Sequence, residues 1–217
     1  MLVIRNPPTN AVGIIFGQVG ESDFASTDKA TAGYNYYAIA INAYNNSGFD
    51  KETDGTFKLD GVFQVTTDDD NTNFYSKEDM SGYASTQALL NIKAGNTIKG
   101  ILNSNFTAPA GNNSGWFITS AGQWWMLAKA ANGQDVDPVR FNNTWGQNNG
   151  TVYNWMATRI EKAGIAPNDN TTNWTLTRSA NGTNIYTVGI TTAKFSFGNV
   201  AVVERNSNRF VRPIIAF

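Results

Sequence analysis

Acidic residues in turn-like stretches are the first side chains whose types and spacing could support chemistry. Asp50, Glu52 and Asp54 are followed by glycine and match the opening of a calcium-binding loop, in which oxygen ligands at alternate positions converge on one cation. The twelfth position of such a loop needs a bidentate carboxylate, but here it is Gly61. A second acidic turn runs from Asp68 to Asn73, and Asp135 with Asp137 forms a third. Acidic turns are ordinarily hydrated, so we assign no metal ligand and leave calcium binding by one of these loops open.

The side chains that most enzymes use for catalysis are missing. The chain contains no cysteine and no histidine. This excludes disulfides, thiolate or histidine metal sites, a cysteine nucleophile and a Ser-His-Asp triad. Two carboxylates can act as acid and base in glycoside hydrolysis, but no pair stands out here by its spacing. We therefore predict that the protein is not an enzyme, and that it has no catalytic residues and no cofactor.

Aromatic and amide side chains suit ligand recognition better. Sugars stack their apolar C–H faces on aromatic rings, while amides bond their hydroxyl groups. Trp145 lies in an irregular stretch rich in Asn and Gly, so we predict that it is exposed and forms an aromatic platform. Trp124, Trp155 and Trp174 lie in segments with helix or strand character, and we predict that they pack in the core.

The composition is that of a folded chain with little net charge. Of 217 residues, 41% are hydrophobic, 12% aromatic and 15% charged. A chain of this length and hydrophobic content can bury a substantial core. Its formal net charge is -1. This charge gives no electrostatic reason to expect nucleic acid as a partner. No stretch approaches the roughly 18–20 apolar residues that cross a bilayer, and no signal-peptide core follows Met1. We predict one domain over residues 11–217, preceded by a lead-in of residues 1–10.

The pattern of apolar residues predicts an α+β domain. Ser120 and Gln123 have the spacing of a capping box, which predicts that a helix begins after Ser120. Gly133 is placed to end this helix. Pro213 cannot donate a ladder hydrogen bond, so the last strand should begin there or have that position on an edge. The apolar run after it predicts a strand buried on both faces. The expected helices are 82–91, the segment between Ser120 and Gly133, and 151–163; the expected strands are 11–17, 33–43, 61–66, 115–118, 184–190, 194–203 and 210–217.

Several stretches resemble a known group of domains. They are VRPIIAF at 211–217, GYASTQA at 82–88, and WTLT at 174–177 followed by Gly198. They are similar to motifs of bacterial and phage C-terminal domains with a C-type lectin-like (formylglycine-generating-enzyme-like) fold, some of which are variable proteins of diversity-generating retroelements. The resemblance implies a small mixed or antiparallel sheet whose N- and C-terminal strands pair. About three helices and long loops would accompany this sheet. The cysteines of the formylglycine-generating relatives and the calcium motifs of C-type lectins are absent.

The resemblance also implies a ligand surface between these motifs. A strand ladder holds the backbone, so that outward side chains can vary with little effect on stability. The predicted ligand-binding residues include Trp145 as the aromatic platform. They are Trp145, Leu176, Arg178, Asn181, Asn184, Tyr186, Arg205, Asn206 and Asn208. Whether a retroelement diversifies this region is left open.

We therefore expect a non-catalytic, extracellular ligand-binding domain. It would act as an adhesin or receptor-binding module on a bacterial cell surface or a phage virion, and would recognise a surface glycan or protein without entering the membrane. The alternative is a structural terminal domain of a pilus or phage tail fibre, in which exposed apolar and aromatic surface makes subunit contacts.

Overall fold

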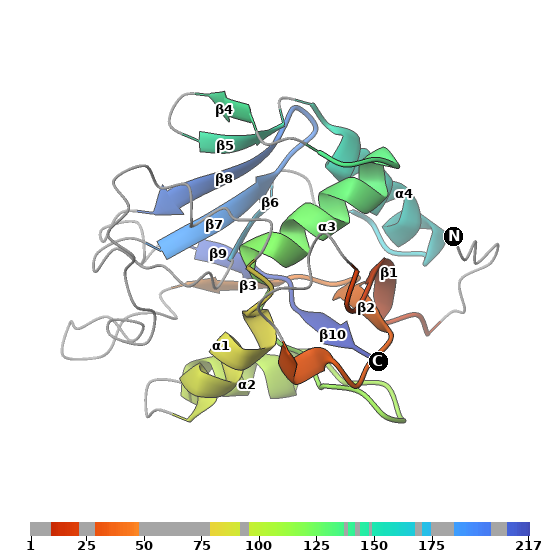
Figure 1. The fold of residues 1–217 in the computed structure, drawn as a ribbon, viewed down its shortest axis with the longest axis vertical. Coiled ribbons are helices and arrows are strands. Elements are labelled where there is room, and N and C mark those ends of the chain that lie inside the picture. Colours follow the sequence, from red (N-terminus) through yellow and green to blue (C-terminus); the bar gives the residue numbers. More distant parts are fainter. Residues whose placement is uncertain are drawn as a thin grey trace.

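The domain contains two β-sheets and four α-helices within its described residues (Figure 1). The computed structural model describes residues 10–21, 29–47, 79–91, 96–136, 139–141, 144–147, 149–167, 171–174, 185–200 and 208–217. Helix α3 runs between the larger and the smaller sheet, with α4 beside it, and α1 and α2 lie together at the opposite end of the molecule from β4 and β5 (Figure 1). The predicted α+β class is confirmed.

The smaller sheet has β2 at its centre. It consists of β1 (Gly13–Gln18), β2 (Tyr36–Ala40) and β10 (Ile214–Ala216), and both outer strands are antiparallel to β2. Ile14 and Ile214 each lie opposite Ile39. The predicted direct pairing of the N- and C-terminal strands is therefore wrong, because β2 lies between them. The physical reason is that β2 is almost wholly buried, so the backbone groups on both of its edges need strand partners.

The last predicted strand is divided between the two sheets. β9 (Asn208–Val211) belongs to the larger sheet and β10 to the smaller one. The break falls at Arg212 and Pro213, and proline has no N–H to donate to a ladder. The prediction that a strand begins at this proline is confirmed to within one residue, since β10 starts at Ile214.

The larger sheet has the strand order β3-β9-β6-β7-β8-β5-β4. Neighbouring strands are antiparallel except β6 and β9, which are parallel. The remaining strands are β3 (Tyr44–Ser47), β4 (Val139–Phe141), β5 (Thr144–Gln147), β6 (Thr171–Trp174), β7 (Ile185–Ile190) and β8 (Phe195–Val200). The strands expected at 184–190 and 194–203 are confirmed as β7 and β8, as far as the described residues extend.

Three of the helices match the predicted ones. The helices are α1 (Gly82–Leu90), α2 (Asn96–Asn105), α3 (Ala121–Asn132) and α4 (Thr151–Lys162), with a short 3-10 helix at Lys29–Thr31. The capping box of α3 is present, because the Ser120 N–H donates to Gln123 Oε1 at 2.9 Å, and Gly133 ends the helix with a φ of 72°. α2 was not predicted, since asparagines and Gly100 are poor helix formers.

Two other sequence predictions have different outcomes. The strand expected at 115–118 is reduced to an isolated bridge between Phe117 and Ile214. The strand expected at 61–66 lies outside the described residues.

Helix α3 packs against both sheets. Residues 121–128 are all buried. Trp125 contacts β8 through Phe195 and Phe197, with ring centroids 5.5 and 4.8 Å apart. On β1, Met126 occupies the space that a Cβ on Gly17 would need. The two sheets therefore share one core that is centred on this helix.

A second apolar cluster covers the other face of the smaller sheet. Ala38 and Ala40 of β2 and Ile215 of β10 pack there with Leu102 of α2 and with Trp116. Because the first core covers Ile214 and Ala216, β10 is buried from both sides, as the sequence predicted.

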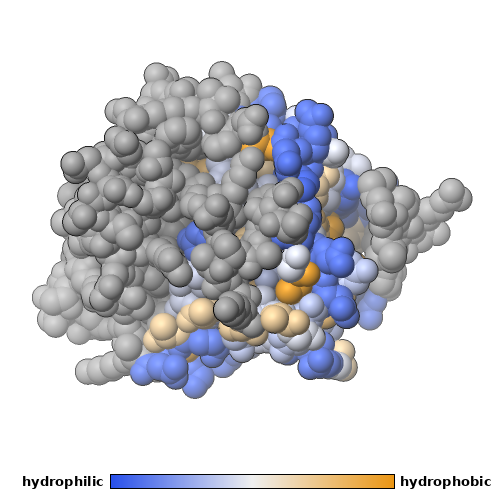
Figure 2. Space-filling model, in the orientation of Figure 1, coloured by the Kyte–Doolittle hydropathy of each residue, from blue (hydrophilic) through white to orange (hydrophobic). Residues whose placement is uncertain are grey.

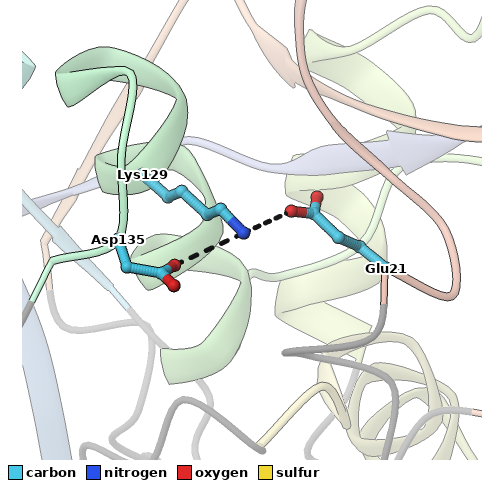
Figure 3. A network of polar contacts seen from close by, with 3 residues as sticks. All are labelled: Glu21, Lys129 and Asp135. Carbon is cyan, nitrogen blue, oxygen red and sulfur yellow. Dashed lines mark ion pairs between the residues drawn. The ribbon is translucent and has the colours of Figure 1, made fainter.

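Lys129 joins α3 to two neighbouring segments (Figure 3). Its Nζ lies 2.7 Å from Glu21 Oε1, beyond β1, and 3.3 Å from Asp135 Oδ1, beyond α3. The Asp135 side chain is 59% exposed, so this second ion pair contributes little to stability. Asp135, considered above for calcium, thus has a lysine partner.

Two helical glycines should respond in opposite ways to the same substitution. A Cβ on Gly82 would lie 2.6 Å from Ile118 O and 3.0 Å from Ser120 N, whereas a Cβ on Gly100 would meet nothing within 4 Å. We expect Gly82→Ala to lower the free energy of unfolding by about 1–3 kcal/mol through overpacking. Gly100→Ala should raise it by about 0.5–1 kcal/mol. Urea denaturation measures both, and an unchanged Gly82→Ala variant would contradict the packing of α1.

Candidate ligand-binding site

The predicted ligand face belongs to the larger sheet and its connections. Outside the described residues lie Leu176, Arg178, Asn181, Asn184, Arg205 and Asn206. For Trp145, Tyr186 and Asn208 the structure describes the backbone, in β5, β7 and β9 respectively. Trp145 pairs with Phe197 and Tyr186 with Asn199, so the structure brings both positions to strands that flank β8. Asn208 is not brought there, because β6 separates β9 from β7.

The ends of three strands adjoin residues 175–184 and 201–207, the two ranges that contain six of the predicted ligand-binding residues. Trp174 lies opposite Thr187, and Ile185 lies opposite Val200. The end of β6, the start of β7 and the end of β8 therefore share one end of the sheet. Of the predicted face, the structure therefore describes this end of the sheet and the backbone at Trp145, Tyr186 and Asn208.

The middle of β7 and β8 is buried on both faces. Val188 and Phe197 are completely buried in the core, and Thr187 and Ser196, at the alternating positions, are 4% and 7% exposed. Side chains in the middle of these strands therefore have no room for a ligand. Contacts on this part of the sheet would have to come from its ends.

The GYASTQA motif packs α1 against the segment that leads into α3. The backbone N–H of Ile118 donates to Thr86 Oγ1 at 3.0 Å, and Thr86 is completely buried. The Tyr83 ring meets Phe117 edge-on, with centroids 5.4 Å apart. Together with the tight contact of Gly82, these interactions give most of the motif a packing role.

The arginine of the VRPIIAF motif is a buried structural residue. Arg212 is 4% exposed, and its Nη1 donates to the carbonyl oxygens of Ala40 at 2.9 Å and Ile41 at 2.5 Å. Burial lowers the pKa of Arg212 to about 10, so the guanidinium stays charged at neutral pH. It therefore satisfies the carbonyl groups at the end of β2 and is not available to a ligand.

The tryptophans predicted to be core residues differ in burial. Trp124 is completely buried, which confirms its prediction. Trp155 is half-buried at the edge of the core, and the Arg159 guanidinium carbon lies 3.9 Å from its ring centroid. Burial lowers the pKa of Arg159 as well. The side chain of Trp174 lies outside the described part.

A cleft that sequence reasoning missed lies between α1, α2 and the segment before α3. Its volume is about 460 Å³. Figure 2 shows hydrophilic and weakly hydrophobic residues side by side over these helices, along the lower edge of the view. Lys99, Leu102 and Asn103 share one face of α2, because they are spaced at i, i+3 and i+4. This spacing is the sequence signal that could have indicated the cleft. The lining residues are Gln87, Leu90, Lys99, Leu102, Asn103, Phe106, Thr107, Ala108, Ser114, Gly115 and Trp116.

Neither a metal cluster nor a membrane helix is found in the described part of the chain. Among those residues, no three acidic, histidine or cysteine side chains gather closely enough to hold a metal ion. None of the described helices has the length and apolar character needed to span a bilayer. The acidic loop at Asp50, Glu52 and Asp54 lies outside the described residues.

Comparison with known proteins finds one informative similarity, and it concerns the fold. No family model matches the chain, and no curated protein matches it. The crystal structure of a fimbrial protein from Bacteroides ovatus is similar, with a TM-score of 0.59 and 13% sequence identity. The alignment covers 98% of this chain but 45% of that chain, so this chain spans less than half of the fimbrial protein's length. At this identity the similarity establishes a shared fold.

Replacement of Arg212 tests its structural role. We expect Arg212→Ala to lower the free energy of unfolding by about 2–4 kcal/mol, because it leaves a cavity and deprives two carbonyl groups of their donor. Arg159→Ala, which removes a half-buried arginine over Trp155, should cost about 0.5–1 kcal/mol. Chemical denaturation of both variants gives the comparison, and equal losses would contradict the role assigned to Arg212.

Proposed function

We propose that this chain is a non-enzymatic recognition domain on the outside of a bacterial cell or a phage. Its ligand, a surface glycan or protein, would be contacted by side chains of segments 175–184 and 201–207. One observation carries the proposal: the strands next to these segments are held by completely buried residues such as Val188 and Phe197. Because the core holds the middle of these strands, side chains beyond their ends can serve recognition at little cost to the fold.

The fold shared with a fimbrial protein supports an extracellular place for this domain, because fimbriae are surface fibres. The partial coverage of that protein is consistent with a domain that forms one part of a fibre protein. Carriage on a fibre would present the recognition surface away from the cell. A C-type lectin-like fold, inferred from the VRPIIAF and GYASTQA motifs, remains part of this proposal.

A second candidate function is a structural one within a fibre, and exposed apolar residues favour it. Val12, Ile15 and Tyr36 are 41%, 38% and 42% exposed. Ile15 lies on β1 and Val12 just before it, whereas Tyr36 is the first residue of β2; β1 is an edge strand whose one partner among the described strands is β2. Exposed apolar side chains beside a sheet edge suit contacts between subunits.

Loss of ligand capture without loss of stability is the expected signature of the recognition function. The double variant Arg205→Ala with Asn206→Ala should lose capture on arrays of glycans and surface proteins, because it removes polar contact groups. Its melting temperature should stay within about 2 °C of the parent value, as for surface substitutions. A matched double variant on exposed positions of α4, Asn154→Ala with Lys162→Ala, should retain capture.

The outcomes separate the two candidate functions. Unfolding of the Arg205/Asn206 variant would mark these residues as structural, and unchanged capture would place the ligand elsewhere. The structural function is supported instead if neither the parent chain nor its variants capture a ligand, and if the parent chain self-associates whereas the Ile15→Lys variant does not.

A further inference from the structure

The cleft between α1 and α2 is preformed, because its floor belongs to the second apolar cluster. Leu102, Phe106 and Trp116 are 4%, 8% and 8% exposed, and the two aromatic rings lie 6.1 Å apart. The wall at Ser114 is joined to β10, since Ser114 N donates to Ala216 O and Ala216 N donates to Ser114 Oγ, both at 2.9 Å. A site held in this way loses little conformational entropy on binding.

Three polar side chains of the cleft have no side-chain partner among the described residues, whereas Ser114 Oγ is already bonded to Ala216 N and Gly115 O. Gln87, Lys99 and Asn103 make no side-chain hydrogen bond with any other described residue. Each amide offers both donors and an acceptor, an arrangement that can pair with neighbouring hydroxyl groups. Lys99 is the one charged residue in the described lining, which contains no carboxylate. The cleft therefore favours a ligand that carries hydroxyl groups and a negative charge.

The remaining lining adds an apolar requirement. Leu90 is partly exposed, and the buried floor formed by Leu102, Phe106 and Trp116 adds a small apolar surface beside the amides. The volume of about 460 Å³ lies in the range of small-molecule sites, roughly 300–1,000 Å³. A sugar ring has an apolar C–H face and a polar edge, whereas a simple anion has no apolar face.

We propose that this cleft binds an acidic saccharide, with the carboxylate near Lys99, the hydroxyl groups at Gln87 and Asn103, and the ring against the apolar wall. The site is separate from the end of the larger sheet where the recognition surface was proposed. Either site can therefore fail without the other.

Titration of the whole chain with single sugars tests this inference. The probes are the methyl glycosides of glucuronic acid and glucose, with sodium acetate as a bare carboxylate, followed in ¹H–¹⁵N NMR spectra. We expect the glucuronide to give saturable shifts at Gly115 and at the Trp116 indole N–H, with weaker binding of the glucoside and no saturation by acetate.

Three variants locate the binding site. Lys99→Met should weaken glucuronide binding by about twofold to fivefold, the range of one exposed ion pair. Ala108→Trp, at an exposed lining position, should abolish binding by filling the cleft while the fold is retained. Lys162→Met makes the same charge change on α4 and should leave binding unaltered.

Several results would overturn the proposal. They are the absence of saturable shifts, equal affinity for the glucuronide and the glucoside, saturation by acetate, or shifts confined to residues outside the cleft. Tighter binding of a peptide with a free C-terminal carboxylate would assign the cleft to a different ligand class. The cleft could show no saccharide binding while the Arg205/Asn206 variant still loses ligand capture on the arrays. That result would overturn the cleft proposal and leave the proposed recognition function standing.

Discussion

The hydrogen bonding of β2 on both of its edges is the constraint on which the rest of the structure depends. β1 pairs along one edge and β10 along the other, so segments about 200 residues apart meet on one strand. The backbone N–H of Ala40 donates to Pro213 O at 2.9 Å, and that of Ile41 to Val12 O at 3.1 Å. Both apolar clusters then pack on this sheet. Because β9 directly precedes β10, the same closure also positions the larger sheet.

Features that depend on local chemistry could be predicted from the sequence. The capping residues of α3 and the strand start after Pro213 follow from backbone donors and acceptors a few residues apart. The order β1-β2-β10 could not be predicted, because it depends on which distant segment supplies the second partner of β2. α2 was missed since its propensity is poor and its position depends on the burial of Leu102 against the smaller sheet. The cleft depended on α2, so its lining was missed too.

The residues of the sequence motifs and the surfaces available to ligands are largely separate. Thr86 and Arg212 are buried and bonded to backbone groups, and Gly82 leaves no space for a side chain. The ends of β6, β7 and β8 lie away from α1 (Figure 1), and the lining of the cleft includes one residue of these motifs, Gln87. This separation gives a physical basis for recognition on a constant scaffold, because ligand-facing side chains can change without disturbing the buried hydrogen bonds.

Native-state hydrogen exchange of two neighbouring amides measures the double pairing of β2 directly. The Ala40 amide reports on the β10 edge, and the Ile41 amide reports on the residue that precedes β1. If the closure holds the fold together, both amides should exchange only through global unfolding, with the opening free energy that denaturation gives for the whole domain. Exchange of the Ala40 amide through a local opening of much lower free energy would contradict this account, because β10 would then detach while the domain stayed folded.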